Sequence, residues 1–145
     1  MGEYTGLRCK LKIKDEFVPL IESMVKDRLD WGDLNTEHLF IKDFAEYNRS
    51  SFIPYGMLSY MPDEWEEVDH ADWNTTFVDK VWTFQCSLKN YEDTIEKFFT
   101  DVLPEITEVS LHIETYYNGS GYAYLHKLED GSVVETGEKI EYRDY

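Results

Sequence analysis

Three segments of the chain alternate between apolar and polar residues with a period of two. In residues 7–13 the residues that alternate with the apolar ones are basic. Residues 81–88 and 107–117 show the same period of two, with other polar residues between the apolar ones. Successive side chains of a strand point to opposite faces, so each segment is expected to be a strand with one buried face. The inward-facing residues are then Leu7, Cys9, Leu11, Ile13, Trp82, Phe84, Cys86, Leu88, Val109, Leu111 and Ile113.

Apolar residues at helical spacing occupy the intervals between these strands. A helix is expected from Asp15, a suitable N-cap, to about residue 29, with Pro19 tolerated in its first turn. Further helices are expected over residues 36–47 and, capped by Asn90, over residues 91–103.

The remaining segments are shorter or more polar. Residues 57–61 are expected to form a short strand, and residues 63–76 a solvated loop with Trp65 and Trp73 anchoring its ends. The Asn118–Gly121 turn should lead into a return strand over 122–128, and residues 132–136 should add an edge strand. Residues 137–145 read as a charged tail with one last pairing near Ile140 and Tyr142.

This order predicts a single α+β domain spanning residues 1–145. Without its additions, it is the βαββαβ order of a ferredoxin-like core: an antiparallel sheet with helices on one face, plus an extra helix and C-terminal hairpin strands. The first and third core strands would be central neighbours, which would bring Cys9 and Cys86 close together as small buried thiols. The open face of the sheet would carry Arg8, Lys10, Lys12, Thr83, Gln85, Ser87, Ser110, His112, Glu114 and Tyr116.

The charge balance narrows the partners that the chain can have. Thirty acidic residues against fourteen Lys and Arg give a net charge of −16, which repels nucleic acid and anionic membranes and attracts basic partners. No apolar run is long enough to span a bilayer and no leader precedes the first strand, so we expect a cytoplasmic protein. Nucleic-acid binding is disfavoured, although the basic strip and nearby tyrosines leave a sheet-based mode open.

No motif in the chain carries a recognisable chemistry. The carboxylates of residues 63–72 lack the spacing of a calcium loop, the four histidines are scattered, and the glycines at 119–121 do not open a helix. Cys86 lies within a strand on an apolar face, which does not suit a nucleophile. We expect no cofactor and no metal, and a chain that is not an enzyme.

Two short stretches, residues 84–93 and 1–7, resemble small uncharacterised acidic proteins of Gram-positive bacteria and their prophages. The resemblance implies a bacterial accessory protein and assigns no activity or site residue.

Three hypotheses follow. The first is a non-enzymatic, immunity- or inhibitor-like module that binds a basic protein through residues 63–72, namely Asp63, Glu64, Trp65, Glu66, Glu67, Asp69 and Asp72. The second is a small-molecule-binding or enzymatic domain that uses the open sheet face near Lys10, Gln85, His112 and Tyr116. The third is a homodimer formed through the open face or an edge strand.

Overall fold

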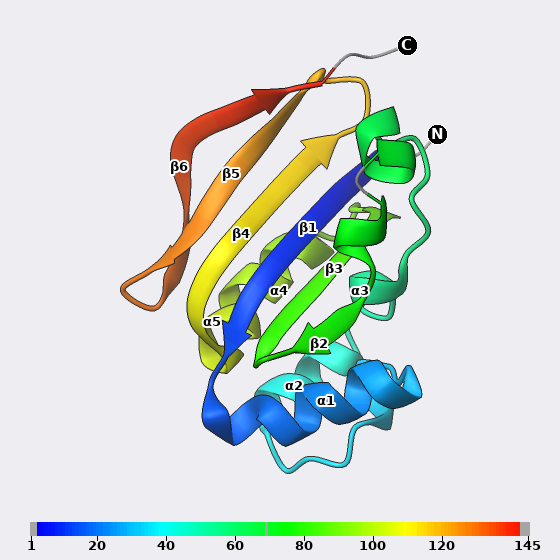
Figure 1. Ribbon diagram of the computed structural model, residues 1–145. Coiled ribbons are helices and arrows are strands. Elements are labelled where there is room, and N and C mark those ends of the chain that lie inside the picture. The colour runs from blue at the N-terminus through cyan, green and yellow to red at the C-terminus, as the bar shows by residue number, and fades with distance from the viewer. Residues whose placement is uncertain (1–2, 69, 143–145) are drawn as a thin grey trace.

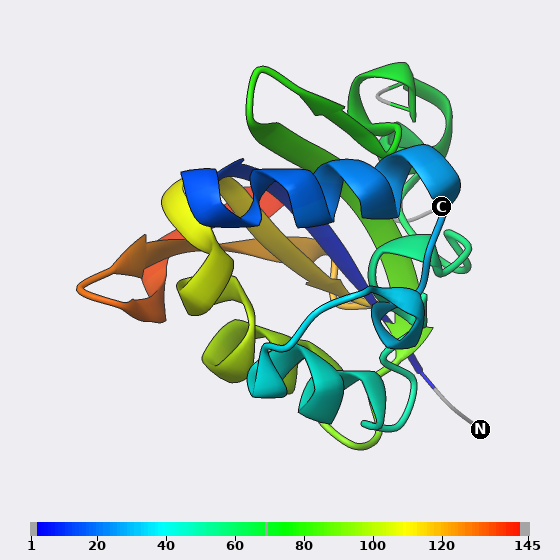
Figure 2. The same cartoon turned by 90° about the horizontal axis from the view of Figure 1, so that it is seen from below.

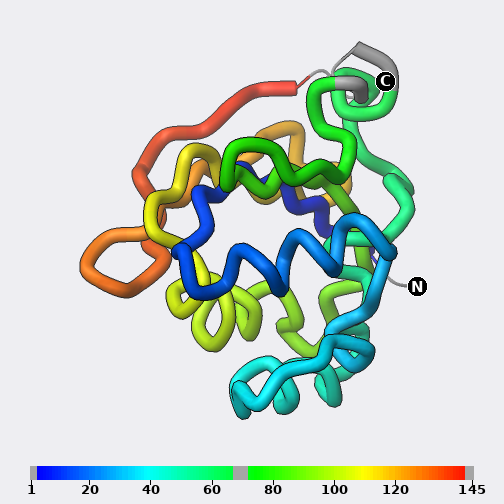
Figure 3. The backbone as a smooth tube through the Cα atoms, turned by 60° about the horizontal axis from the view of Figure 1, so that its bottom comes forward, coloured from blue at the N-terminus to red at the C-terminus, as the bar shows by residue number. Residues whose placement is uncertain are grey.

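One antiparallel sheet of six strands organises the molecule (Figure 1). A computed structural model describes residues 3–68 and 70–142, and the side chains of 67–71 lie outside the description. The strands run in the spatial order β2-β3-β1-β4-β5-β6. They are β1 (Tyr4–Ile13), β2 (Thr76–Val78), β3 (Val81–Lys89), β4 (Thr107–Tyr117), β5 (Tyr122–Glu129) and β6 (Ser132–Glu141). The turn joining β5 and β6 projects beyond the rest of the fold (Figure 3).

Helices cover one face of this sheet (Figure 2). The longer ones are α1 (Val18–Asp27), α2 (Leu39–Ala45) and α4 (Thr94–Asp101), with shorter turns η1 (Asp15–Phe17), η2 (Trp31–Asp33) and α5 (Leu103–Ile106). The N-cap residue of α4 is Asp93 rather than the predicted Asn90, but the Oδ1 of Asn90 accepts a hydrogen bond of 2.9 Å from the backbone N–H of Ile95 in the first turn. Helix α3 (Phe52–Tyr55) packs against β3, and the residue that follows α3, Gly56, lies against Ser87, beyond the start of β3 where the short β2 pairs.

The main core lies between the helices and the inward residues of β1, β3 and β4. Its centre is aromatic: the ring of Trp31 lies 5.5 Å from Phe44, 6.0 Å from Trp82 and 6.0 Å from Phe98, measured between centroids. Trp31 also donates its indole N–H to the carbonyl of Ile53 at 2.7 Å, so its one polar atom is satisfied. Aromatic rings thus supply much of the buried surface.

The α+β class, the antiparallel sheet and the main helices agree with the sequence prediction. The ferredoxin-like topology is not confirmed, because the six-strand order differs from that of a four-stranded ferredoxin-like sheet. The prediction of a strand over residues 57–61 was wrong, since these residues form neither helix nor strand. The edge strand expected over residues 132–136 is confirmed as the start of β6, which continues as far as Glu141 where a tail was expected; the expected pairing near Ile140 is formed with Ala123.

Strand β4 departs from its expected pattern at a β-bulge. The pairing of β1 with β4 shifts between Lys10 and Leu11, which leaves one residue of β4 out of register. As a result Val109 and Leu111 are exposed, whereas both were predicted to be buried, and only Ile113 of that set reaches the core.

Residues 57–74 cross the face of the sheet opposite the helices. They include the single turns η3 (Glu64–Val68) and η4 (His70–Trp73). Met61 and Trp65 pack there against Tyr116 and Ala123 in a second, smaller core. The sheet face expected to be open is therefore covered over part of its area.

Candidate functional site

The guanidinium of Arg8 lies between two tryptophan rings on the covered part of the sheet. Its central carbon is 4.4 Å from the ring centroid of Trp65 and 4.7 Å from that of Trp73. Arg8 donates from Nε to Gln85 Oε1 at 3.0 Å, and Gln85 in turn donates to the backbone carbonyl of Trp65 at 3.1 Å. Cation–π contacts gain strength when water is excluded, so this stack fastens the 57–74 segment to the sheet.

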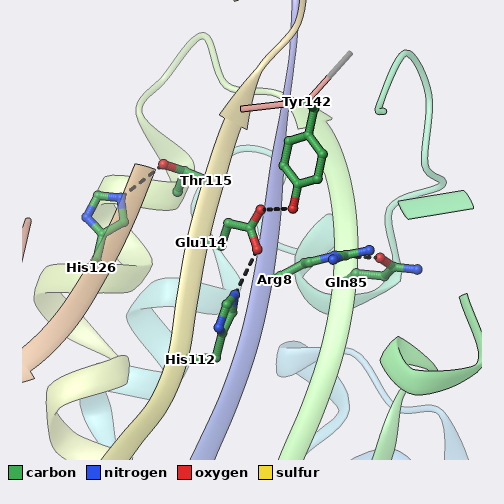
Figure 4. Close-up of polar contacts among 7 residues, drawn as sticks. All are labelled: Arg8, Gln85, His112, Glu114, Thr115, His126 and Tyr142. Carbon is green, nitrogen blue, oxygen red and sulfur yellow. Dashed lines mark hydrogen bonds and ion pairs between the residues drawn. The ribbon is translucent and has the colours of Figure 1, made fainter. Parts of the chain in front are cut away.

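A chain of polar contacts continues across β4 (Figure 4). The carboxyl of Glu114 is buried, contacts His112 Nε2 at 2.8 Å and accepts a hydrogen bond of 2.6 Å from the hydroxyl of Tyr142. Burial and the contact with Glu114 raise the pKa of Tyr142 well above its ordinary value, so it remains a donor. Within this network Glu114 is buried, whereas His112 and Tyr142 are half-buried.

The structure places the four residues predicted for an open-face site under or beside this cover. Gln85 and Tyr116 are buried, His112 is half-buried with its ring 5.0 Å from Trp73, and the ammonium of Lys10 lies 4.6 Å from the same ring centroid. The predicted basic strip is wrong at Arg8, which is 2% exposed. Trp65 and Trp73, which were expected to anchor the ends of the acidic loop, instead cover Arg8, and Trp73 also covers Lys10.

The acidic residues of 63–72 occupy this same segment. Asp63, Glu66 and Asp72 are exposed and Glu64 is half-buried, while Trp65 is fully buried and so is a core residue rather than a contact residue. Asp69 and the side chain of Glu67 lie outside the described residues. Exposed acids alone do not define a binding site.

A more complete arrangement lies at the end of the sheet where β1 begins and β3 and β4 end. Here a groove of about 570 Å³, which we call the end groove, opens between the strand ends and α4. It is lined by Glu3, Thr5, Asn90, Tyr91, Asp93, Glu96 and Tyr117. The pairing of Thr5 with Tyr117 and of Tyr4 with Lys89 brings these distant segments together.

Three carboxylates surround the end groove, each from a different segment. Glu3 precedes β1 and accepts a hydrogen bond of 3.0 Å from the Asn118 amide, and Glu96 accepts one of 2.7 Å from Asn90. Asp93 adopts a left-handed conformation with φ of 55°. All three are exposed, and among the described residues none forms an ion pair.

Two tyrosine rings complete the lining of the end groove. Tyr91 and Tyr117 are 56% and 51% exposed. Tyr91 already contacts a cation, because the guanidinium carbon of Arg49 lies 5.2 Å from its ring centroid. Carboxylates beside exposed aromatic faces favour binding of an ammonium or guanidinium group.

The residues described by the structure contain no cluster of His, Cys, Asp and Glu able to hold a metal ion. The thiols of Cys9 and Cys86 are buried in the main core, as predicted, and burial raises the pKa of each. In the described part of the chain, no helix has both the length and the apolar character needed to cross a membrane.

Comparison with known proteins gives no relative on which a function could be based. No family model, no curated protein and no solved structure matches the chain.

Sequence reasoning missed every charged and aromatic residue of the end groove. The available signal was topological: once the first and third core strands are predicted as antiparallel neighbours, the start of one must lie beside the end of the other. The cluster Tyr91, Glu92 and Asp93 directly after the third core strand would then have pointed to this end of the sheet.

Proposed function

We propose that the protein is a non-catalytic binding module that captures a basic segment of another protein, with a Lys or Arg side chain seated in the end groove. One observation carries this proposal: Glu3, Asp93 and Glu96 surround the same groove as two exposed tyrosine rings. A single cation in the groove would contact carboxylate oxygens and the face of a tyrosine ring at the same time.

The charge of the whole molecule supports the same direction. With a net charge of −16, the protein attracts a basic partner over distances comparable with the Debye length and speeds the encounter. In the cytoplasm, such a module would act as an inhibitor- or immunity-like protein. The exposed acids Asp63, Glu66 and Asp72 would extend the field that guides the partner toward the groove.

The test uses a fluorescein-labelled peptide of alternating arginine and glycine, titrated with the full chain at low salt and followed by fluorescence anisotropy. Asp93→Asn is the first variant, because asparagine tolerates the left-handed backbone at this position. Loss of one exposed charge contact should weaken binding about two- to fivefold. Adding Glu3→Gln and Glu96→Gln should abolish measurable binding.

Asp130→Asn is a matched control for the charge and the backbone. Asp130 is exposed and left-handed, with φ of 52°, but lies in the turn between β5 and β6. Equal weakening by the control would show that only the net charge matters. Stronger weakening by an Asp63→Asn, Glu66→Gln variant would move the site to the 63–72 segment, and no binding of the peptide to the unmodified chain would refute the proposed function.

A further inference from the structure

A second hollow lies on the other side of the strands that form the end groove. Tyr4 and Lys89 are paired across β1 and β3, and their side chains point to the face opposite those of Thr5 and Leu88. A cavity of about 350 Å³ opens beside them, which we call the edge pocket. It is lined by Tyr4, Arg49, Phe52, Gly56, Met57, Ser59, Ser87, Leu88 and Lys89.

The side chain of Ser87 joins β3 to residues 57–59 at the wall of the edge pocket. Ser87 donates its hydroxyl to the carbonyl of Met57 at 2.5 Å and accepts the N–H of Ser59 at 2.9 Å. Gly56 lies so close to the carbonyl of Ser87 that an added Cβ would overlap it. Because the hydroxyl of Ser87 is already hydrogen-bonded within the protein, a ligand in the edge pocket would make its polar contacts chiefly with charged side chains.

Two cations reach the edge pocket, although acids outnumber bases about two to one in this chain. The ammonium of Lys89 lies 5.7 Å from the ring centroid of Tyr4, and the guanidinium of Arg49 stacks on Tyr91. Among the described residues neither cation forms an ion pair with a carboxylate. Both therefore keep donors available for an anion.

Large apolar side chains that are partly open to solvent also line or flank the edge pocket. Phe52 and Met57 are 46% and 83% exposed, and the ring of Tyr60, itself 71% exposed, stacks on Tyr4 at 5.4 Å. Large side chains exposed together around a concavity commonly mark a binding site. A ligand that covered them would gain from burial of apolar surface as well as from charge pairing.

We infer that the edge pocket binds a small organic carboxylate with an apolar or aromatic body. The carboxylate would pair with Arg49 and Lys89, and the apolar body would lie against the exposed side chains of Phe52 and Met57. A cavity of about 350 Å³ is at the small end of ligand sites, which fits one ring or branched chain with its charged group. A bare inorganic anion would leave the apolar wall uncovered.

The test compares N-acetyl-L-phenylalanine with its neutral amide, which has the same body without the charge. Binding to the full chain is followed by shifts of backbone N–H resonances in two-dimensional NMR. We expect saturable shifts at residues 56–59 and 87–89, a Kd of about 0.1–1 mM for the acid, and about tenfold weaker binding of the amide. Equal binding of acid and amide, or shifts that do not saturate, would overturn the inference.

Two substitutions with matched controls locate the site. Arg49→Gln and Lys89→Gln should each raise the Kd of the acid at least about threefold. Arg28→Gln is the control for Arg49→Gln, because both arginines have a left-handed backbone and both guanidinium carbons lie 5.2 Å from the centroid of a tyrosine ring. Lys139→Gln is the control for Lys89→Gln, because the ammonium of Lys139 also lies over a tyrosine ring, that of Tyr122. If the controls weaken binding as much, the pocket assignment is wrong. The outcome is independent of the arginine-peptide titration, which tests the other groove.

Discussion

Gly6 offers a direct test of how the 57–74 segment sits on the sheet. This residue lies in β1 under the second core, and a Cβ added to it would overlap Met61 Sδ and come within 2.7 Å of a ring carbon of Trp65. The substitution Gly6→Ala therefore adds one methyl group where there is no space for it. The backbone of Gly6 is not left-handed, so the effect is one of packing alone.

Two responses set the size of the effect. If the neighbours shift slightly, overpacking should lower the free energy of unfolding by about 1–3 kcal/mol. If the ring of Trp65 leaves its site instead, exposure of about 200 Å² of apolar surface at about 25 cal/mol per Å² sets an upper figure of about 5 kcal/mol. We expect a loss of about 2 kcal/mol, since the end of a methionine side chain adapts easily.

The measurement is urea unfolding followed by circular dichroism and by tryptophan fluorescence. Gly32→Ala is the control, because its Cβ would have only Ala45 nearby, at 3.9 Å, and should change stability by less than about 0.5 kcal/mol or raise it slightly. In a Met61→Ala background the cost of Gly6→Ala should fall by about 1 kcal/mol. A Gly6→Ala protein as stable as the parent would refute the packing of Trp65 and Met61 on β1.

Two further predictions concern the polar contacts of Figure 4. Tyr142→Phe removes the hydrogen bond to the buried carboxyl of Glu114, and we expect it to lower the free energy of unfolding by about 1–3 kcal/mol in urea titrations; an unchanged midpoint would contradict a buried contact. Burial lowers the pKa of His126 below its ordinary value, so the unfolded chain binds more protons at mildly acidic pH. Stability should therefore decrease as the pH falls from about 7 through about 6.5 towards the folded pKa, and His126→Gln should flatten this dependence; identical slopes for the two proteins would rule it out.

The periodic parts of the chain were predictable because burial imposed their rhythm. Leu7, Cys9 and Leu11 of β1 and Phe98 of α4 face one continuous core, so hydrophobic spacing alone identified their elements. The bulge in β4 broke the same reasoning at Leu111, because one unpaired residue changes which face the neighbouring positions occupy.

The cover over the polar face was not predictable from periodicity. Trp65 and Trp73 lie among acids and carry no regular spacing, although both were expected to anchor the loop that contains them. Both rings pack against Arg8, which the alternating pattern of β1 predicted to face solvent. The two proposed sites were missed for a related reason, since each joins segments that are distant in the sequence. Arg49, between α2 and α3, lines a pocket with Lys89 at the end of β3, and Glu3, before β1, lines a groove with Asp93, before α4.

The central position of β1 also determines when the protein can assemble during synthesis. Leu7 pairs on one side with Cys86 of β3 and on the other with Thr115 of β4, so β1 is synthesised before both of the strands that flank it. Pairing between strands so far apart in the sequence slows folding, and the apolar side chains of β1 remain exposed until the other strands pair with it. The apolar face of β1 should thus be most exposed to aggregation before β4 has been synthesised.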